Sequence, residues 1–436
     1  MEELAEGHAG DDGRALRPAG VLDALAGPAK LAARALATLG GGAKDAALRA
    51  WADALQDRVD EILRANGRDL ESAAKASAAP AIVDRLRLDE GRVRQMAEGL
   101  RQLVVLKDPV GTVIEGWTLP NGLRVEKIRV PLGVIGVIYE GRPNVTVDAA
   151  GLAIKAGSAA LLRGSRIAEH SNAALTRILQ EVGESAGLPA GAVQAVPPTR
   201  ESAREMMRAR GLIDLLIPRG GNDLIQAVVR ESRVPVIETG VGNCHVYVDA
   251  RADLDKAVRI LVNAKVQRPG VCNAAETFLV HRDVADAFVP KALAALEAHG
   301  VEVFGDEEIT RFGPEAGIVV KPATDEEYRA EFLDLKIAAR VVGSLEEAID
   351  HVNTFGTQHT ECIVTEDYEA ARRFIEAVDA AAVMVNASTR FTDGGEFGMG
   401  AEIGISTQKL HARGPMALPE LTTYKFVVYG TGQVRD

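Results

Sequence analysis

The sequence predicts an α/β fold built from two doubly wound αβα units. Short β-rich segments alternate with helical segments between residues 134 and 386, a pattern that builds parallel sheets covered by helices on both faces. A Pro-Asn-Gly turn at residues 120–122 lies between two further β-rich segments and indicates a hairpin. The chain of 436 residues is 47% hydrophobic and 26% charged, which suits two or three globular domains.

The first half of the chain begins with helices. We expect residues 1–18, an acidic stretch, to form a disordered tail. Ala-, Leu- and Arg-rich segments follow up to about residue 100, with apolar residues at three- and four-residue spacings. The predicted hairpin joins Thr112–Ile114 to Val125–Ile128. After it we expect strands at 134–139, 159–163, 212–217 and 234–237, and helices at 147–155, 171–186, 202–209 and 222–231.

A second αβ series begins after Val246. It is expected to contain helices at 254–265, 282–298 and 345–352, and strands at 277–280, 338–342, 361–364 and 382–386. No repeat or low-complexity linker separates the two series, so the pattern alone places their boundary near residues 238–248. A cleft between two such units is the natural place for a functional site.

Composition excludes several classes of protein. The net charge of -12 and the lack of a Lys/Arg cluster argue against a nucleic-acid partner. The longest apolar run, Val130–Tyr139, is interrupted by proline and glycine and is too short to span a bilayer. The acidic N-terminal segment does not resemble a secretory signal, so we expect a cytoplasmic protein without a membrane partner.

The metal-binding and disulfide-forming residues are sparse. Cys244, Cys272 and Cys362 are far apart, which favours free thiols in a reducing compartment over disulfides or a zinc site. His351 and His359 lie eight residues apart with no third ligand near in sequence, which favours packing or hydrogen bonding over metal binding. We therefore expect no metal.

Cys272 is the candidate nucleophile. It follows Arg268-Pro269-Gly270-Val271 and precedes small residues that are compatible with a helix. If a helical turn begins there, its free amides and dipole would favour the thiolate, which is the reactive form. A small buried hydrophobic residue is the alternative interpretation.

Three loops follow predicted strands, where ligands bind in doubly wound sheets. They are Arg163–Ser165, Pro218–Asn222 and Glu238–Asn243. Arg219-Gly220-Gly221-Asn222 stands where a helix begins, an arrangement that captures phosphate, although a plain turn between strand and helix is the alternative. The chain contains neither a G-x-G-x-x-G dinucleotide fingerprint nor a phosphate-binding G-x-x-x-x-G-K-[ST] loop.

Four segments of the sequence resemble the γ-glutamyl phosphate reductase family of the aldehyde dehydrogenase superfamily. They are residues 130–147, 219–222, 267–273 and 348–361, and the resemblance extends from about residue 20 to residue 429. It implies an aldehyde dehydrogenase-like fold whose cofactor domain lacks the usual glycine fingerprint. It also implies the NADPH-dependent reduction of γ-glutamyl phosphate to glutamate 5-semialdehyde, a step of proline biosynthesis.

The resemblance implies a division of the chain. Residues 19–109 and 138–238 would form the cofactor-binding domain, and residues 239–386 the catalytic domain. Residues 387–414 would return to the cofactor domain, while 110–137 and 415–436 would form an oligomerisation arm. An exposed strand invites pairing, so Leu421–Tyr429 could join the hairpin of a partner subunit in a dimer or tetramer. A transient contact with glutamate 5-kinase, which makes the labile acyl phosphate, is a further expected partner interaction.

The resemblance also implies catalytic roles. The Cys272 thiolate would attack the acyl phosphate and form a thioester, which then accepts a hydride. Asn144 and the Cys272 backbone amide are the candidate oxyanion donors, although Asn144 could equally cap a helix. Glu238 resembles the general base of hydrolytic aldehyde dehydrogenases in position, but residues 239–243 depart from their Glu-Leu-Gly-Gly text.

Cofactor and substrate residues follow from the same resemblance. Arg163 and Ser165 would lie near the adenosine ribose and the 2′-phosphate of NADP, although a solvated surface arginine is the alternative for Arg163. The candidates near the pyrophosphate, nicotinamide and nicotinamide ribose are Arg219, Gly220, Gly221, Asn222 and Glu331. The candidates for the substrate carboxylate and phosphoryl group are Arg142, Lys265, Arg268 and Arg390. Two other functions stay open: another semialdehyde dehydrogenase of the superfamily, or a non-catalytic nucleotide-binding relative.

Overall fold

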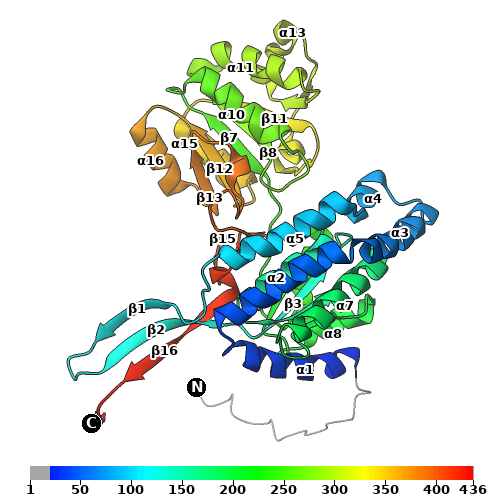
Figure 1. Cartoon of the computed structure of the whole chain (residues 1–436). Coiled ribbons are helices and arrows are strands. Elements are labelled where there is room, and N and C mark those ends of the chain that lie inside the picture. Colours follow the sequence, from blue (N-terminus) through cyan, green and yellow to red (C-terminus); the bar gives the residue numbers. More distant parts are fainter. Residues whose placement is uncertain (1–19, 436) are drawn as a thin grey trace, which may run out of the picture.

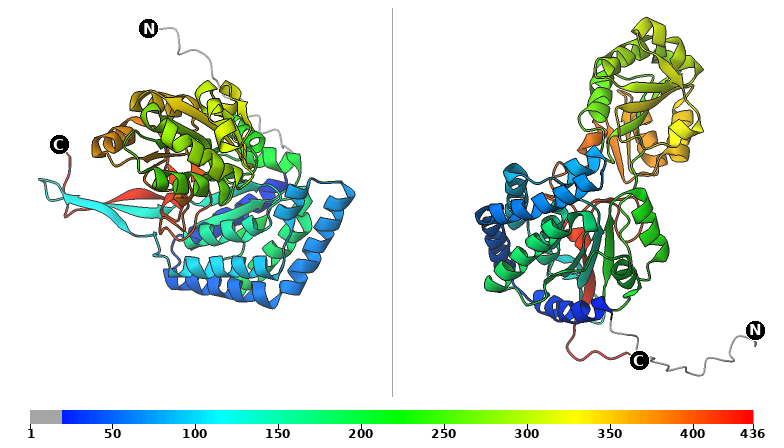
Figure 2. Two further views of the ribbon diagram at one scale, coloured as in Figure 1. Left: turned by 90° about the horizontal axis from the view of Figure 1, so that it is seen from above. Right: turned by 90° about the vertical axis from the view of Figure 1, so that its right-hand side faces the viewer.

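The computed structural model describes residues 20–435, which form two αβ units and a projecting arm (Figure 1). Each unit contains its own parallel sheet, and the arm contains a three-stranded antiparallel sheet. Figure 2 shows the two units as separate bodies joined by narrow segments of chain. The predicted α/β fold with two units and a hairpin arm is confirmed, and the predicted tail of residues 1–18 lies outside the described residues.

The first unit surrounds a four-stranded sheet in the order β5-β4-β3-β6. Every residue of β3 is buried, because helices cover both faces of the sheet. The strands are β3 (Val134–Tyr139), β4 (Ala159–Arg163), β5 (Val193–Ala195) and β6 (Leu215–Arg219). The helices are α1 (Val21–Leu36), α2 (Gly41–Asp57), α3 (Val59–Lys75), α4 (Pro80–Leu86), α5 (Glu90–Val105), α6 (Asn144–Lys155), α7 (Glu169–Ser185), α8 (Arg200–Arg208) and α9 (Asn222–Glu231).

One predicted strand of this unit does not form. Residues 234–237 make a single parallel bridge, between Leu216 and Val236, in place of a strand. Pro235 has no N–H to donate and offers only its carbonyl, to Leu216 N at 2.8 Å. The prediction of a strand there is therefore wrong, while the short strand β5 was not predicted.

The second unit contains a seven-stranded parallel sheet in the order β10-β9-β11-β8-β7-β12-β13. Its two faces are covered by separate apolar clusters. The strands are β7 (Cys244–Val248), β8 (Ala275–His281), β9 (Glu302–Gly305), β10 (Val320–Pro322), β11 (Lys336–Val342), β12 (Thr360–Val364) and β13 (Ala382–Val385). The helices are α10 (Leu254–Val266), α11 (Arg282–Glu297), α12 (Glu307–Arg311), α13 (Gly313–Ala316), α14 (Asp325–Arg329), α15 (Leu345–Phe355) and α16 (Tyr368–Ala377).

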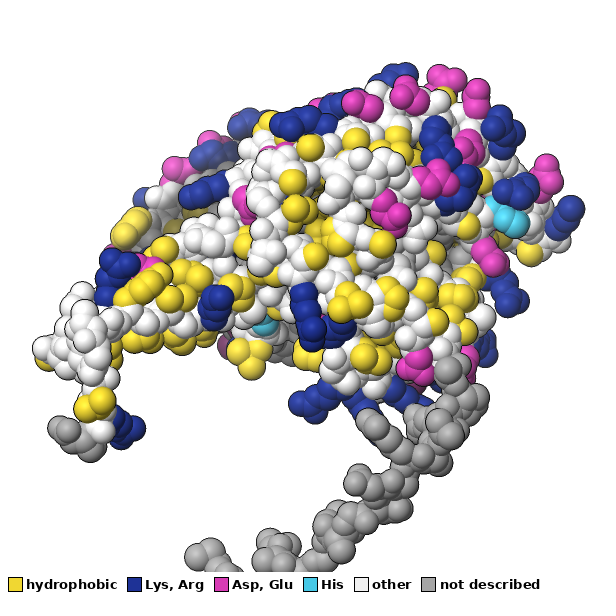
Figure 3. Space-filling view, turned by 60° about the horizontal axis from the view of Figure 1, so that its bottom comes forward, with side chains coloured by type: hydrophobic (Ala, Val, Ile, Leu, Met, Phe, Trp, Pro, Cys, Tyr) yellow, Lys and Arg dark blue, Asp and Glu magenta, His cyan; other side chains and the backbone are white. Residues whose placement is uncertain are grey.

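The arm consists of β1 (Val113–Thr118), β2 (Arg124–Pro131) and β16 (Thr422–Tyr429). Gly122, with φ of +86°, makes the predicted hairpin turn between β1 and β2. β16 pairs with β2 of the same chain along its whole length, from Thr422 opposite Pro131 to Tyr429 opposite Arg124. One edge of β16 is therefore taken by its own hairpin, and its pairing with a partner's hairpin through the other edge stays a prediction. Figure 3 shows apolar side chains along the tapering arm, and Trp117, Phe426 and Val428 are exposed.

Two segments link the units. Residues 239–243 lead from the first unit into β7, and residues 386–414 lead back from β13. The two segments meet at a bridge between Thr239 and Ser406, next to the short pair β14 (Ile405–Ser406) and β15 (Gly414–Pro415). Short 3-10 turns occur at 166–168, 389–391 and 419–421. Among residues 20–435, no helix combines the length and apolar character needed to cross a bilayer.

Candidate active site

Cys272 lies in a turn between α10 and β8, and its side chain is half-buried. Ala274 N donates to Val271 O at 3.0 Å, and the chain then enters β8 without forming a helix. The expected helix start is therefore wrong. Burial raises the pKa of the Cys272 thiol to about 11. The carboxylates of Glu331 and Glu402 also raise this pKa, whereas the positive charge of Arg219 lowers it.

Arg219 is the leading positive charge acting on Cys272. It ends β6, and its guanidinium packs against Gly404, where a Cβ atom would lie 2.5 Å from Nη1. A side chain at residue 404 would meet both Arg219 and Thr239, so a glycine there lets the returning segment pass close to Arg219. The sequence predicts Arg219 near the cofactor, and in the structure its charge acts on the nucleophile.

Three further arginines share this region. Desolvation lowers the pKa of Arg142, the positive charges of Arg219 and Arg268 lower it further, and Cys272 raises it. Arg390 donates from Nε to Gln267 Oε1 at 2.9 Å and also contacts Asn273. Desolvation and the charge of Arg268 lower the pKa of Arg390. These like charges repel one another, which makes the region around Cys272 suited to an anionic ligand.

Lys265 does not join this group. Its Nζ lies 2.7 Å from Glu276 Oε2, and both side chains are 0% exposed. Burial lowers the pKa of Lys265 and raises that of Glu276, while each charge opposes the shift of the other. The prediction that Lys265 binds substrate is wrong, because its charge is already paired inside the second unit.

Glu331 reaches the nucleophile's loop. Its Oε1 accepts a hydrogen bond from Gly242 N at 2.7 Å, and burial raises the pKa of its carboxyl. Since the Glu331 charge also raises the pKa of Cys272, the two side chains share one environment. The second carboxyl oxygen has no bond to Gly242 and is the atom available for a ligand hydroxyl.

Asn144 is the first residue of α6 and does not act as its cap, which is Pro143. Its Nδ2 donates to Asp148 Oδ2, one turn later, at 2.9 Å. Burial raises the pKa of Asp148 to about 6, while Asn144 and the charge of Arg219 lower it. One hydrogen of the Asn144 amide is therefore engaged by Asp148, and the other is free to act as a donor.

Glu238 is bound by two glutamine side chains. Its Oε1 accepts from Gln226 Nε2 of α9 at 3.0 Å, and its backbone N–H donates to Gln408 at 2.8 Å. The carboxylates that chiefly raise the pKa of Cys272 are Glu331 and Glu402. A role of Glu238 near the thiol stays a prediction.

The start of α9 already holds a carboxylate. Gly221 N donates to Glu140 Oε2 at 2.8 Å, and a Cβ atom on Gly220 would lie 2.5 Å from the same oxygen. The sequence predicts a phosphate at this position, in the loop that ends with Asn222. Glu140 is an exposed side chain, so a phosphate that bound there would displace it, and the predicted phosphate site stays a prediction.

Arg163 and Ser165 lie at the end of β4, beside a hollow of about 240 Å³. Arg163 Nη2 donates to Thr199 O at 2.9 Å, while its Nε is buried without a partner. Ser165 Oγ accepts from Gly141 N at 3.0 Å. The hollow is lined by Leu162, Gly164, Ser165, Glu169, Asn172, Ala173, Thr176, Ala195, Val196, Pro197 and Pro198.

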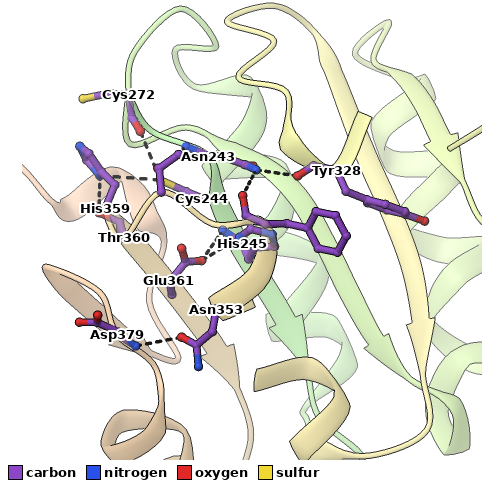
Figure 4. Close-up of polar contacts among 12 residues, drawn as sticks. Asn243, Cys244, His245, Cys272, Tyr328, Asn353, His359, Thr360, Glu361 and Asp379 are labelled. Carbon is purple, nitrogen blue, oxygen red and sulfur yellow. Dashed lines mark hydrogen bonds and ion pairs between the residues drawn. The ribbon is translucent and has the colours of Figure 1, made fainter. Parts of the chain in front are cut away.

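A buried polar cluster lies beneath the Cys272 loop (Figure 4). His245 Nδ1 lies 3.0 Å from Glu361 Oε2, and both side chains are almost fully buried. Burial lowers the pKa of His359 to about 4 and that of His351 to about 2, so both imidazoles are neutral at pH 7. Within residues 20–435, no group of three or more His, Cys, Asp or Glu side chains could hold a metal ion.

Several residues of this site were not predicted as functional. Gly242, Cys244, Glu402, Asp148 and Glu140 contact or influence predicted residues, but no spacing in the sequence marks them. Each of these residues acquires its place through contacts with distant parts of the chain.

Comparisons with known proteins point in one direction. The family model described as the aldehyde dehydrogenase family matches residues 17–318. The chain is similar to γ-glutamyl phosphate reductase of Thermobifida fusca, with 57% identity over 93% of this chain and 97% of that protein. For the enzyme of the same name from Moorella thermoacetica, the identity is 56% over 94% and 97%. The crystal structure of γ-glutamyl phosphate reductase from Thermotoga maritima superposes with a TM-score of 0.92 at 47% identity, covering 95% of this chain and 100% of that one.

Proposed function

The chain belongs to the aldehyde dehydrogenase family and, within it, to the γ-glutamyl phosphate reductases, and we propose that it reduces γ-glutamyl phosphate to glutamate 5-semialdehyde and phosphate. This would be a step of proline biosynthesis from glutamate. The observation that carries the proposal is the placement of a half-buried thiol, Cys272, in an environment shared with Arg142, Arg219 and Arg390. A dianionic acyl phosphate is the kind of substrate that such charges attract.

Cys272 is the proposed nucleophile. Its thiolate sulfur forms a bond to the carbonyl carbon, and the bond from that carbon to the phosphate oxygen breaks, so phosphate leaves with the electron pair. Burial disfavours the thiolate and Arg219 favours it, so the arrival of further positive charge near the sulfur would speed attack.

The arginines have distinct proposed partners. Arg219 and Arg142 come from the first unit, and we assign them to the phosphoryl group. Arg268 and Arg390 come from the second unit and would bind the α-carboxylate. A fork of guanidinium donors suits both anions.

Asn144 and the Cys272 backbone amide are the proposed donors to the tetrahedral oxyanion. The free hydrogen of the Asn144 amide is available because Asp148 occupies only the other one. Each donor of this kind is worth on the order of 100- to 1000-fold in rate.

The proposed cofactor is NADPH, and the chain has room for its adenosine end. The hollow beside β4 offers apolar walls, and the unpartnered Nε of Arg163 is a buried donor lacking an acceptor. When bound, the cofactor supplies the hydride that converts the thioester to the aldehyde. Glu331 would accept from the nicotinamide ribose through the carboxyl oxygen that Gly242 leaves free.

We also propose a cytoplasmic homo-oligomer that forms through the arm. Exposed Trp117, Phe426 and Val428 give the arm an apolar surface of the kind that a second copy covers. A transient contact with glutamate 5-kinase would shorten the exposure of the labile acyl phosphate to water.

The test is the reverse reaction. Glutamate semialdehyde, phosphate and NADP should yield NADPH with the wild-type protein, followed at the absorbance of the reduced nicotinamide. Cys272→Ala should lower the rate by at least ~10⁴-fold. Undiminished turnover in that variant would contradict the covalent mechanism, and turnover of another semialdehyde at a higher kcat/KM would show that a related dehydrogenase activity is the main one.

A further inference from the structure

The backbone carbonyl of Cys272 is bound from behind by a second cysteine. Cys244, the first residue of β7, is 0% exposed, and its Sγ donates to Cys272 O at 3.2 Å. Figure 4 shows the Cys272 carbonyl directed at Cys244 while the Cys272 sulfur points away from it. The pairing of β7 with β8 shifts register just after Cys244, so the strand begins with an irregularity beneath the Cys272 loop.

Gly242 closes the space on another side of the same carbonyl. A Cβ atom at residue 242 would lie 1.5 Å from Cys272 O, which no side chain could tolerate. Gly242 N is itself fixed, because it donates to Glu331 Oε1 at 2.7 Å. The Cys272 carbonyl therefore packs against the backbone of Gly242 and accepts one hydrogen bond, from the Cys244 thiol.

The proton of Cys244 is committed to that carbonyl. Thr360 Oγ1 uses its one hydrogen to donate to Thr392 Oγ1 at 3.0 Å. Thr360 Oγ1 can therefore only accept from His359 Nδ1, which lies 2.8 Å away and must carry the hydrogen. An Nδ1 that carries hydrogen cannot accept from Cys244, whose Sγ lies 3.8 Å away. Burial raises the pKa of Cys244 well above its ordinary value, which keeps the S–H bond intact while Cys272 ionises.

We propose that Cys244 is a positioning residue for the nucleophile. Its S–H bond and the bare backbone of Gly242 hold the carbonyl of Cys272, and thereby the peptide plane that follows the nucleophile. That plane fixes the ψ angle of Cys272 and hence the direction in which its sulfur leaves the loop. The inference rests on the proposed function only in taking Cys272 as the nucleophile.

Cys362 offers a matched control. It is also 0% exposed, lies in the neighbouring strand β12, and donates from Sγ to a backbone carbonyl, Ala387 O, at the same 3.2 Å. It differs from Cys244 in that its acceptor does not belong to the nucleophile. If substitution acts only through lost packing, kcat should change alike at both positions. If Cys244 positions the nucleophile, kcat should fall only when Cys244 is substituted.

The experiment compares Cys244→Ala, Cys244→Ser and Cys362→Ala in the full chain. We measure kcat and KM in the reverse assay, and the rate at which iodoacetamide alkylates Cys272 at pH 8, by mass spectrometry of the Cys272 peptide. We expect Cys244→Ala to lower kcat roughly tenfold, the effect of one hydrogen bond, with KM changed less than twofold. The alkylation rate should change as well, and Cys244→Ser, which keeps a donor, should restore most of kcat.

Equal kcat values for Cys244→Ala and Cys362→Ala, with unchanged alkylation of Cys272, would overturn the proposal. So would a loss confined to KM. If Cys244→Ala does not fold, Cys244→Val fills the same volume without a donor and carries the same expectation. Failure of the proposed function would appear separately, as retained turnover in Cys272→Ala, because alkylation of Cys272 requires neither substrate nor cofactor.

Discussion

The loop that carries Cys272 and the loop that carries Arg219 act on one another, yet they are supported by opposite means. The backbone of Cys272 is supported by buried residues: Cys244 donates a hydrogen bond to its carbonyl, and Gly242 packs against that carbonyl. The Arg219 loop continues into exposed Gly220 and Gly221, and Gly221 N donates to the carboxylate of Glu140. The second unit thus provides a fixed nucleophile, and the first unit provides charges that can adjust to a ligand.

The difference has a physical reason. A nucleophile has to be held within a fraction of an ångström, which needs packed and hydrogen-bonded surroundings. Charges that bind an anion act over longer distances and tolerate partial exposure. A site assembled from both kinds of support can stay open to substrate while keeping its reacting atom in place.

The largest expected effect concerns a buried ion pair inside the second unit. Lys265→Ala removes one partner of the fully buried Lys265–Glu276 pair and leaves an uncompensated carboxyl, at a cost of about 3–5 kcal/mol in unfolding free energy. Chemical denaturation measures this. The control is Lys321→Ala, which breaks the solvent-exposed pair with Glu302 and should cost less than about 1 kcal/mol. Equal losses would mean that burial gives the Lys265 pair no more weight in stability than an exposed pair.

The next effect concerns the first unit's donor to the reacting carbonyl. Asn144→Ala should lower kcat by roughly 100- to 1000-fold, while loss of its hydrogen bond to Asp148 should lower the unfolding free energy by only about 1 kcal/mol. Asp148→Asn keeps an acceptor for the Asn144 amide, so it should lower kcat far less. Similar kcat values for Asn144→Ala and the wild type would exclude the oxyanion role.

The smallest expected effect concerns how the charges around Cys272 change the ionisation of its thiol. Arg219→Ala removes the positive charge that lowers the pKa of Cys272, and Glu402→Gln removes a negative charge that raises it. Below the thiol pKa of about 11 the thiolate fraction rises about tenfold per pH unit, so alkylation of Cys272 should speed up from pH 7 to pH 10 in all variants.

At fixed pH the two variants should differ in sign. Arg219→Ala should slow the alkylation by roughly tenfold, and Glu402→Gln should accelerate it severalfold. Each is compared with the wild type across the pH range with iodoacetamide. Shifts in the same direction would mean that electrostatics does not govern the thiol, and that access of the reagent does.

Local sequence patterns anticipated much of the fold. The strands at 134–139 and 159–163 and the helix at 222–231 form with the predicted bounds, because the residues within each segment suffice to specify it. The segment at 234–237 failed because Pro235 removes a donor from a strand at the sheet's margin. The site was less predictable, since Lys265 and Arg390 look equally suitable as anion binders until burial pairs one of them with Glu276.

The sequence by itself determined the alternation of strands and helices, the hairpin arm, and Cys272 as the candidate nucleophile within a text that resembles one reductase family. These features depend on residues that are close together in the sequence, so they can be predicted from the sequence alone. The tertiary structure alone decided which charges act on the thiol, that Glu140 occupies the start of α9, and that Cys244 and Gly242 support the nucleophile's carbonyl. The reason is that desolvation, charge and close packing depend on which distant residues meet, and only the folded chain brings residues 219, 244, 272 and 331 into one environment.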